Sequence, residues 1–281
     1  MIRELDVQKV TETVSRLCVS ANIFLNEDIK TAFAEAKERE KSETAKDVLS
    51  QLLQNAEIAR ESRIPICQDT GMAVVFLEIG QDLHLSGGDL YAAVNKGVAH
   101  GYETGYLRKS VVSDPISRLN TKDNTPAIIH TRIVGGDSLK IIVAPKGFGS
   151  ENMSGVKMLK PSDGIDGVKA FVLDTVKNAG SNPCPPIVAG VGVGGTMEYA
   201  ALMAKHALLL PVTAKNPDEF WAGAEKSLLD DINKQGVGAA GFGGVTTALA
   251  VHINVFPTHI AGLPVAVNIG CHVTRHAEEV L

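Results

Sequence analysis

Apolar positions near the start of the chain recur at the spacing of one helix face. The residues that share this spacing of three or four are Val7, Val10, Val14, Leu17, Ala21 and Phe24. Two further helices are predicted, over 26–40 with Asn26 as its cap and over 42–62 with Ser42 as its cap. Residues 1–63 are therefore predicted to form a helical segment.

After residue 63 the pattern changes to short β-branched runs, bounded by glycine or proline, that alternate with helical segments. The runs of strand length are MAVVFLEIG (72–80), AIIHTRIV (127–134), LKIIVAP (139–145) and PPIVAGVGV (185–193). Helices are predicted within 86–108, 163–180, 196–210 and 216–236. This alternation predicts an α/β (mixed α+β) fold, with one compact domain over 1–281 on which the helical segment packs.

Composition narrows the possible partners and the location. The chain has 281 residues, of which 44% are hydrophobic and 21% charged, so it can bury a substantial core. Acidic residues exceed basic ones by 32 to 27 and only 5% are aromatic, which argues against a nucleic-acid partner. No apolar run approaches the roughly 20 residues that span a bilayer, and the N-terminus lacks a signal-peptide pattern. We expect a cytoplasmic protein without a membrane partner.

Gly190, Gly192 and Gly195 follow an apolar run in the order G-x-G-x-x-G, the spacing of a dinucleotide-binding loop. That fingerprint also requires a second strand ending in Asp or Glu about 20 residues further on. The sequence there, ALLLPVTAKNPDEF, has its acids in a predicted helix start. Close packing of a helix against a strand explains the glycines more simply, and a nucleotide-dependent oxidoreductase is a distant alternative.

Three of the four cysteines share one setting. Cys18 lies on or beside the apolar face of the first helix and is expected to be buried. Cys67, Cys184 and Cys271 each lie in a turn made by proline or glycine next to a strand-like run. A zinc site using Cys271 and the histidines of CHVTRH is one alternative. An iron–sulfur cluster is another alternative. A cluster of four irons is normally bound by four cysteines; when only three are present, one iron has no protein ligand and can bind a substrate.

Polar residues suited to a small polycarboxylate substrate accompany these cysteines. Gln68 and Asp69 follow Cys67 directly and could orient and protonate a bound substrate. Arg108 opens a polar stretch that runs to residue 130, and arginine is the natural bidentate partner of a carboxylate. The loop KGFGSENMS offers backbone N–H groups to an anion. His259 precedes the last cysteine by one predicted strand.

Six motifs, in one order along the chain, resemble the N-terminal, cluster-binding part of the class I fumarases, the iron–sulfur hydro-lyases that include L-tartrate dehydratase. They are ICQDTG, YLRKSVVSDPISRLNTKDNTPAIIH, KGFGSENMS, NPCPPIVAGVGVGGT, AKHALL and FPTHIAGLPVAVNIGCHVTRH. The resemblance covers 1–281. It implies a [4Fe–4S] cluster held by Cys67, Cys184 and Cys271, whose fourth iron binds malate or fumarate.

The resemblance also implies roles for other residues and a partner chain. Asp69 is the implied proton donor to the leaving hydroxyl, and the implied substrate contacts are Gln68, Arg108, Gly149 and His259. The family's base, a threonine, and further Arg and Lys ligands lie in a C-terminal domain absent from this sequence. We therefore expect the α subunit of a two-subunit, oxygen-sensitive fumarate hydratase of the tricarboxylic acid cycle, active only with a β subunit and within a higher oligomer.

Two alternatives to this function remain. The same chemistry on L-tartrate would make the chain the α subunit of an L-tartrate dehydratase, because groups that recognise the second hydroxyl could lie in the missing domain. A different class of protein would be the nucleotide-dependent oxidoreductase or a cluster-bearing redox sensor.

Overall fold

The computed structural model describes residues 2–281 and divides the chain into two compact units. Unit 1 comprises the chain up to Leu25, Ala56–Phe148 and Arg275–Leu281, and unit 2 comprises Asn26–Asn55 and Gly149–Thr274. The sequence predicts one compact domain over 1–281. The structure differs because each unit has its own sheet and its own hydrophobic cluster.

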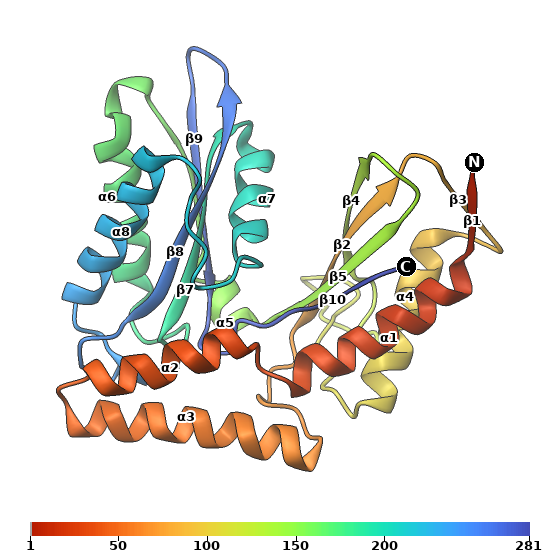
Figure 1. The fold of residues 1–281 in the computed structure, drawn as a ribbon, viewed down its shortest axis with the longest axis horizontal. Coiled ribbons are helices and arrows are strands. Elements are labelled where there is room, and N and C mark those ends of the chain that lie inside the picture. Colours follow the sequence, from red (N-terminus) through yellow and green to blue (C-terminus); the bar gives the residue numbers. More distant parts are fainter. Residues whose placement is uncertain (1) are drawn as a thin grey trace. The chain divides into compact units, whose positions relative to one another are not determined.

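Unit 1 is a sheet with helices packed on it. Its elements are β1 (Arg3–Asp6), α1 (Val7–Ile23), β2 (Met72–Gly80), β3 (Leu83–Ser86), α4 (Leu90–Thr104), β4 (Ile128–Val134), β5 (Leu139–Lys146) and β10 (Ala277–Val280) (Figure 1). The main sheet has the order β10-β5-β2-β4, in which β2 runs parallel to β4 and antiparallel to β5. β1 and β3 form a separate parallel pair. The core joins apolar residues of α1 and α4 to those of β2 and β5.

Unit 2 has a sheet with helices on both faces. Its elements are α2 (Glu27–Arg39), β6 (Gly155–Leu159), α6 (Gly164–Ala179), β7 (Ile187–Gly195), α7 (Met197–Ala207), α8 (Glu219–Lys234), β8 (Ala248–Thr258), β9 (Leu263–Gly270) and two 3-10 turns, Pro161–Asp163 and Ala239–Gly241. The helices α3 (Glu43–Ser62) and α5 (Phe148–Glu151) each contribute residues to both units. The sheet order is β6-β9-β7-β8; β7 runs parallel to β8 and antiparallel to β9.

The two faces of β7 pack against different helices, since successive side chains of a strand point to opposite faces. Ile187, Ala189, Val191 and Val193 belong to the core that contains apolar residues of α6 and α8. On the opposite face, Gly190 and Gly192 meet α7: a Cβ on Gly190 would lie 2.1 Å from Ala204 O, and one on Gly192 would lie 2.0 Å from Ala200 O. The prediction that these glycines serve close helix–strand packing is confirmed, and the dinucleotide-loop alternative loses its structural basis.

Most predicted elements are confirmed. The four predicted strands are β2, β4, β5 and β7, and the four later helices are α4, α6, α7 and α8. Ser42 Oγ accepts a hydrogen bond from the Ala45 N–H at 3.3 Å, as expected of a cap. The segment 1–63 is not wholly helical, because residues 3–6 form strand β1, which pairs with β3 about 80 positions later in the chain.

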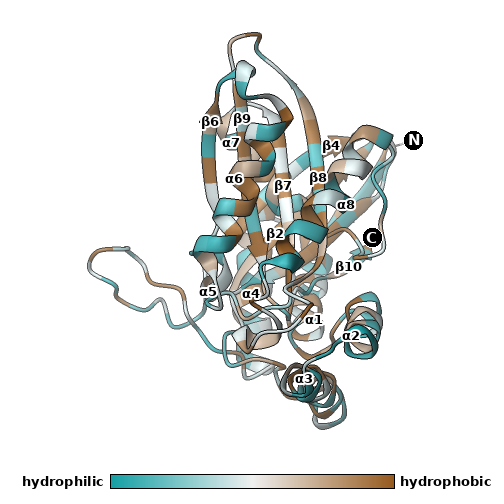
Figure 2. Ribbon diagram, turned by 90° about the vertical axis from the view of Figure 1, so that its left-hand side faces the viewer, coloured by the Kyte–Doolittle hydropathy of each residue, from teal (hydrophilic) through white to brown (hydrophobic). Residues whose placement is uncertain are grey.

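The hydropathy of the elements follows their place in the fold. Hydrophobic residues run along β2 and β7, whereas hydrophilic residues colour much of α2 (Figure 2). Across residues 2–281, no helix has both the length and the apolar character needed to cross a membrane.

Candidate functional site

In unit 1, the segment around Cys67 links α3 to β2 and is anchored just before the cysteine. Ile66 is buried, and its N–H donates to Asn22 O at 2.9 Å. Cys67 itself is partly exposed, and its thiol donates to Gln68 Oε1 at 3.3 Å. Gln68 is exposed. The structure therefore presents a thiol and an amide side by side on a fixed backbone.

The Asp69 carboxylate is oriented by two backbone N–H groups. Oδ1 accepts from the Gly71 N–H at 3.0 Å, and Oδ2 accepts from the N–H of Phe148, the first residue of α5, at 2.9 Å. Gly71 has φ +73°, and a Cβ there would lie 2.7 Å from Lys146 N, so only glycine fits this close approach. The carboxylate is thus held in one orientation beside Cys67.

The backbone of Arg108 contacts the segment that carries Cys67 and Asp69. The Thr70 hydroxyl donates to Arg108 O at 3.0 Å, and the Arg108 side chain is exposed. Asn124 holds the polar stretch that follows: its Oδ1 accepts from the Ser110 N–H at 2.7 Å, and its Nδ2 donates to Gly71 O at 3.2 Å. Asn124 is fully buried. The structure thus brings Cys67, Gln68, Asp69 and the Arg108 backbone together within unit 1.

In unit 2, Cys184 and Cys271 lie at the same end of the sheet. Cys184 shortly precedes β7 and Cys271 directly follows β9, where Val188 pairs with Gly270. His272 joins the two turns, since its N–H donates to Cys184 O at 3.1 Å and its Nδ1 lies 3.0 Å from the same oxygen. Cys184 has φ +54°, a left-handed conformation that is strained for a residue other than glycine. Such strain is found preferentially at functional sites.

Gly149 and the glycine-rich loop of residues 236–245 lie beside the turn that carries Cys184. A Cβ on Gly149 would lie 3.5 Å from Asn182 O, which is ordinary contact with the turn before Cys184. In the glycine-rich loop, the Ala240 N–H donates to Pro185 O at 2.7 Å. The structure therefore brings Gly149, Cys184 and Cys271 together within unit 2.

Glu40 supports this glycine-rich loop, and no sequence signal indicated it. Its side chain is buried and accepts hydrogen bonds from the N–H groups of Lys41, Ser42 and Val245. Burial by itself raises the pKa of Glu40, but the backbone N–H donors of Ser42, Lys41, Val245 and Thr246 outweigh it and lower the pKa below the ordinary value. An ionised carboxylate thus holds the end of the loop that contacts Pro185.

His259 is not brought together with the cysteines of unit 2. It follows β8, which is parallel to β7, so it lies at the opposite end of the sheet from Cys184. The 8 residues of β9 span about 27 Å between the His259 turn and Cys271. His259 is exposed, and its Nδ1 accepts from the Ala261 N–H at 3.2 Å. Its contact with substrate stays a prediction.

The thiols differ in their fitness to bind a metal. Cys18 is fully buried, and burial raises its pKa to about 12, which makes it the least suited of the four thiols to bind a metal. Cys67 and Cys271 are partly exposed and Cys184 is exposed. Three accessible thiols on rigid turns are the donor type that iron–sulfur clusters use. Within residues 2–281, however, no three His, Cys, Asp or Glu side chains lie close enough to hold a metal ion, so the cluster and the zinc alternative stay predictions.

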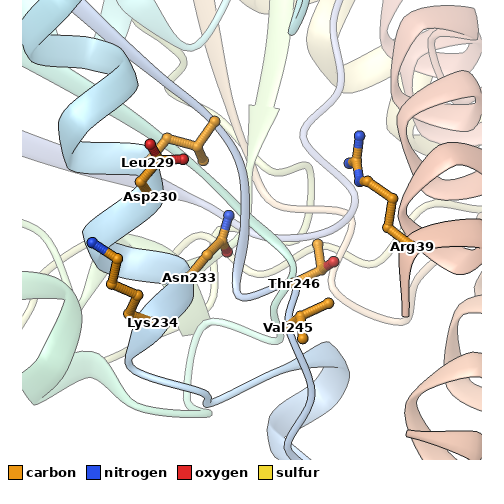
Figure 3. A pocket seen from close by; sticks show the side chains of 7 residues that line it. All are labelled: Arg39, Leu229, Asp230, Asn233, Lys234, Val245 and Thr246. Atoms are coloured by element: carbon orange, nitrogen blue, oxygen red, sulfur yellow. The ribbon is translucent and has the colours of Figure 1, made fainter. Parts of the chain in front are cut away.

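A cleft elsewhere in unit 2 contains none of the predicted site residues. It has a volume of about 620 Å³, with Arg39 of α2 on one side and Asp230, Asn233 and Lys234 of α8 on the other (Figure 3). Asn233 is occupied in structural bonds, since its Oδ1 accepts from the N–H groups of Thr247 and Ala248. Val245, whose N–H donates to Glu40, also lines this cleft.

The chain is a mixed α/β protein whose candidate functional groups lie on the segments that connect its helices and strands: a thiol, an oriented carboxylate and an exposed arginine in unit 1, and two further thiols in unit 2. The sequence model of the fumarate hydratase (Fumerase) family matches residues 11–280 of the chain. The chain belongs to this family, as its six motifs predicted.

Similar proteins carry a related name. A protein of Methanocaldococcus jannaschii named "Putative L(+)-tartrate dehydratase subunit alpha" is 45% identical over 278 residues, which cover 96% of each chain. "L(+)-tartrate dehydratase subunit alpha" of Escherichia coli strain K12 is 29% identical over 273 residues, covering 96% of this chain and 89% of that protein. The protein of the same name from Shigella sonnei shows the same identity and coverage.

Proposed function

We propose that the chain is the α subunit of a two-subunit hydro-lyase that interconverts fumarate and L-malate. The family match and the subunit names of its relatives support this proposal. The observation that carries it is the Asp69 carboxylate, held by the Gly71 and Phe148 N–H groups beside the accessible Cys67 thiol. L-Tartrate is the second candidate substrate, favoured by the name of the relative that is 45% identical.

Cys67, Cys184 and Cys271 would hold the [4Fe–4S] cluster, and all three thiols are at least partly exposed on turns. When bound, the cluster would supply a Lewis acid for the hydroxyl that leaves the substrate.

Residues of this chain would also transfer a proton and bind the substrate. Asp69 would hold the proton that the leaving hydroxyl takes up, and the N–H groups of Gly71 and Phe148 would orient its carboxyl group. Arg108 would bind a substrate carboxylate, because its guanidinium is exposed and offers paired donors. Gln68 would orient the substrate through its amide. The base that removes the C–H proton would come from the β subunit.

Activity assays of the anaerobically purified pair test the proposal. The chain together with a β subunit is expected to hydrate fumarate, or to dehydrate L-tartrate in the alternative case, and to lose activity in air. The chain alone is expected to be inactive. Asp69→Asn is expected to lower kcat by about 10²–10⁴-fold. Asp82→Asn, which changes an exposed carboxylate in the turn between β2 and β3, serves as the matched control.

Iron and sulfide analysis tests the ligand assignment separately. Replacing Cys67, Cys184 or Cys271 by Ser is expected to abolish the cluster, whereas Cys18→Ala should retain it because Cys18 is buried. Unchanged iron content in the three serine variants, or full activity of Asp69→Asn, would refute the proposal.

A further inference from the structure

Three consecutive carbonyl groups that follow Cys67 are each held by a buried side chain. Asp69 O accepts from Arg275 Nη2 at 2.6 Å, and Thr70 O accepts from the Tyr102 hydroxyl at 2.8 Å. Gly71 O accepts from both Tyr102 and Asn124, at 3.1 and 3.2 Å. Tyr102 and Asn124 are fully buried, and Arg275 is 5% exposed. The backbone at Asp69 is therefore held from the interior of unit 1, while its carboxylate is held by backbone N–H groups.

Arg275 is the unusual member of this group. Its guanidinium is buried and charged, yet its hydrogen bond goes to a neutral carbonyl oxygen, and its Nε has no hydrogen-bond partner among residues 2–281. Among residues 2–281, no carboxylate forms an ion pair with Arg275. Burying a charge without an opposite charge is costly, and a neutral donor such as the Tyr102 hydroxyl suffices for the neighbouring carbonyl. A structural role alone does not account for a cation at this position.

We propose that Arg275 is a positioning residue for Asp69. Its charged hydrogen bond fixes the main chain of Asp69, so that the carboxylate stays on the N–H groups of Gly71 and Phe148. Its catalytic consequence rests on the proposed function, in which Asp69 holds the transferred proton. Arg275 also lies four positions after Cys271 in the sequence, so one short segment carries a predicted cluster ligand and the anchor of the predicted acid.

Hydrogen–deuterium exchange in the full chain, resolved to single amides by mass spectrometry, measures the positioning directly. The Gly71 and Phe148 amides report on Asp69 because both donate to its carboxylate. In Arg275→Met both amides are expected to exchange at least about tenfold faster. Arg275→Lys, which retains a cationic donor and serves if the Met variant does not fold, is expected to restore part of the protection.

The matched control for this measurement is Arg3→Met. Arg3 also donates to backbone carbonyls, Asp137 O at 3.2 Å and Leu281 O at 3.0 Å, but it is exposed and away from Asp69. Exchange of the Gly71 and Phe148 amides should be unchanged in this variant. Wild-type exchange at both amides in a folded Arg275 variant would overturn the proposal.

Kinetics of the pair with the β subunit provide the second measurement. With kcat normalised to bound iron, Arg275→Met is expected to lower kcat by about 100-fold, since a small misplacement of a reacting group costs that much. KM should stay within about threefold of wild type, because a buried residue that acts through the Asp69 backbone is not expected to contribute to substrate binding. A change in KM alone, or normal kcat per iron, would contradict a positioning role.

The two measurements separate the two proposals. If the wild-type pair shows no hydro-lyase activity, the proposed function fails, while the exchange data still decide whether Arg275 positions Asp69. If activity is present and exchange is unaffected by the Arg275 variants, the positioning proposal fails and the proposed function stands.

Discussion

Replacing Gly192 by Ala tests whether the glycines of β7 serve helix packing. The new Cβ would lie 2.0 Å from Ala200 O and 2.9 Å from both Ala200 C and Ala204 N. Ordinary contact begins at 3.4 Å, so α7 must move away from β7 by more than an ångström. The atoms that collide are helix backbone, which cannot rotate aside as a flexible side chain would. The expected cost is therefore at the upper end of overpacking, about 3 kcal/mol.

The assay is thermal unfolding followed by circular dichroism. In a unit of this size a loss of about 3 kcal/mol lowers Tm by roughly 6–12 °C. The matched control is Gly223→Ala in α8, where a Cβ meets nothing within 4 Å. This control is expected to leave stability unchanged or to raise it by up to about 1 kcal/mol, because alanine favours helix more than glycine does. A Gly192→Ala protein with the wild-type Tm would refute the packing explanation.

Two further predictions concern a carboxylate and a thiol. The pKa of Glu40 is lower in the folded chain than its ordinary value of 4.5. Its contribution to the free energy of unfolding is therefore fully present above pH 4.5 and is lost as the pH falls through the folded pKa. Glu40→Gln should lower the free energy of unfolding by about 1–3 kcal/mol at pH 7 and by less at pH 3, measured in urea; an equal loss at both pH values would contradict this. Iodoacetamide should modify Cys184 in the folded, cluster-free chain and spare Cys18 until unfolding, as peptide mass spectrometry can show; equal rates would count against the burial of Cys18.

The elements that could be predicted are those whose signal is local. β2 and β4 are β-branched runs between turns, and α6 and α8 are apolar-periodic segments, so their sequences indicate them without a partner. β1 could not be predicted in this way, because four residues form a strand only when β3 pairs with them. The division into two units was missed for a related reason, since each unit combines segments far apart in the chain.

The candidate site shows the same limit. Asp69 could be singled out beside a cysteine in a turn. Arg275 and Asn124 lie in quoted motifs, but they come from distant segments, and nothing in the sequence indicates that they hold the backbone next to Asp69. Glu40 was missed because its partners are backbone N–H groups, which every residue except proline carries. His259 is the opposite case: it precedes Cys271 closely in sequence, but the length of β9 separates the two.

By itself, the sequence determined the family, the alternation of strands and helices, and the contrast between one buried cysteine and three in turns. These follow from residue type and short-range spacing, which act within a few positions of the chain. Only the tertiary structure decided that Gly190 and Gly192 face α7, that His272 joins the turns of Cys184 and Cys271, and that Arg275 holds Asp69. Such contacts depend on which distant segments pack together, and packing is a property of the whole folded chain.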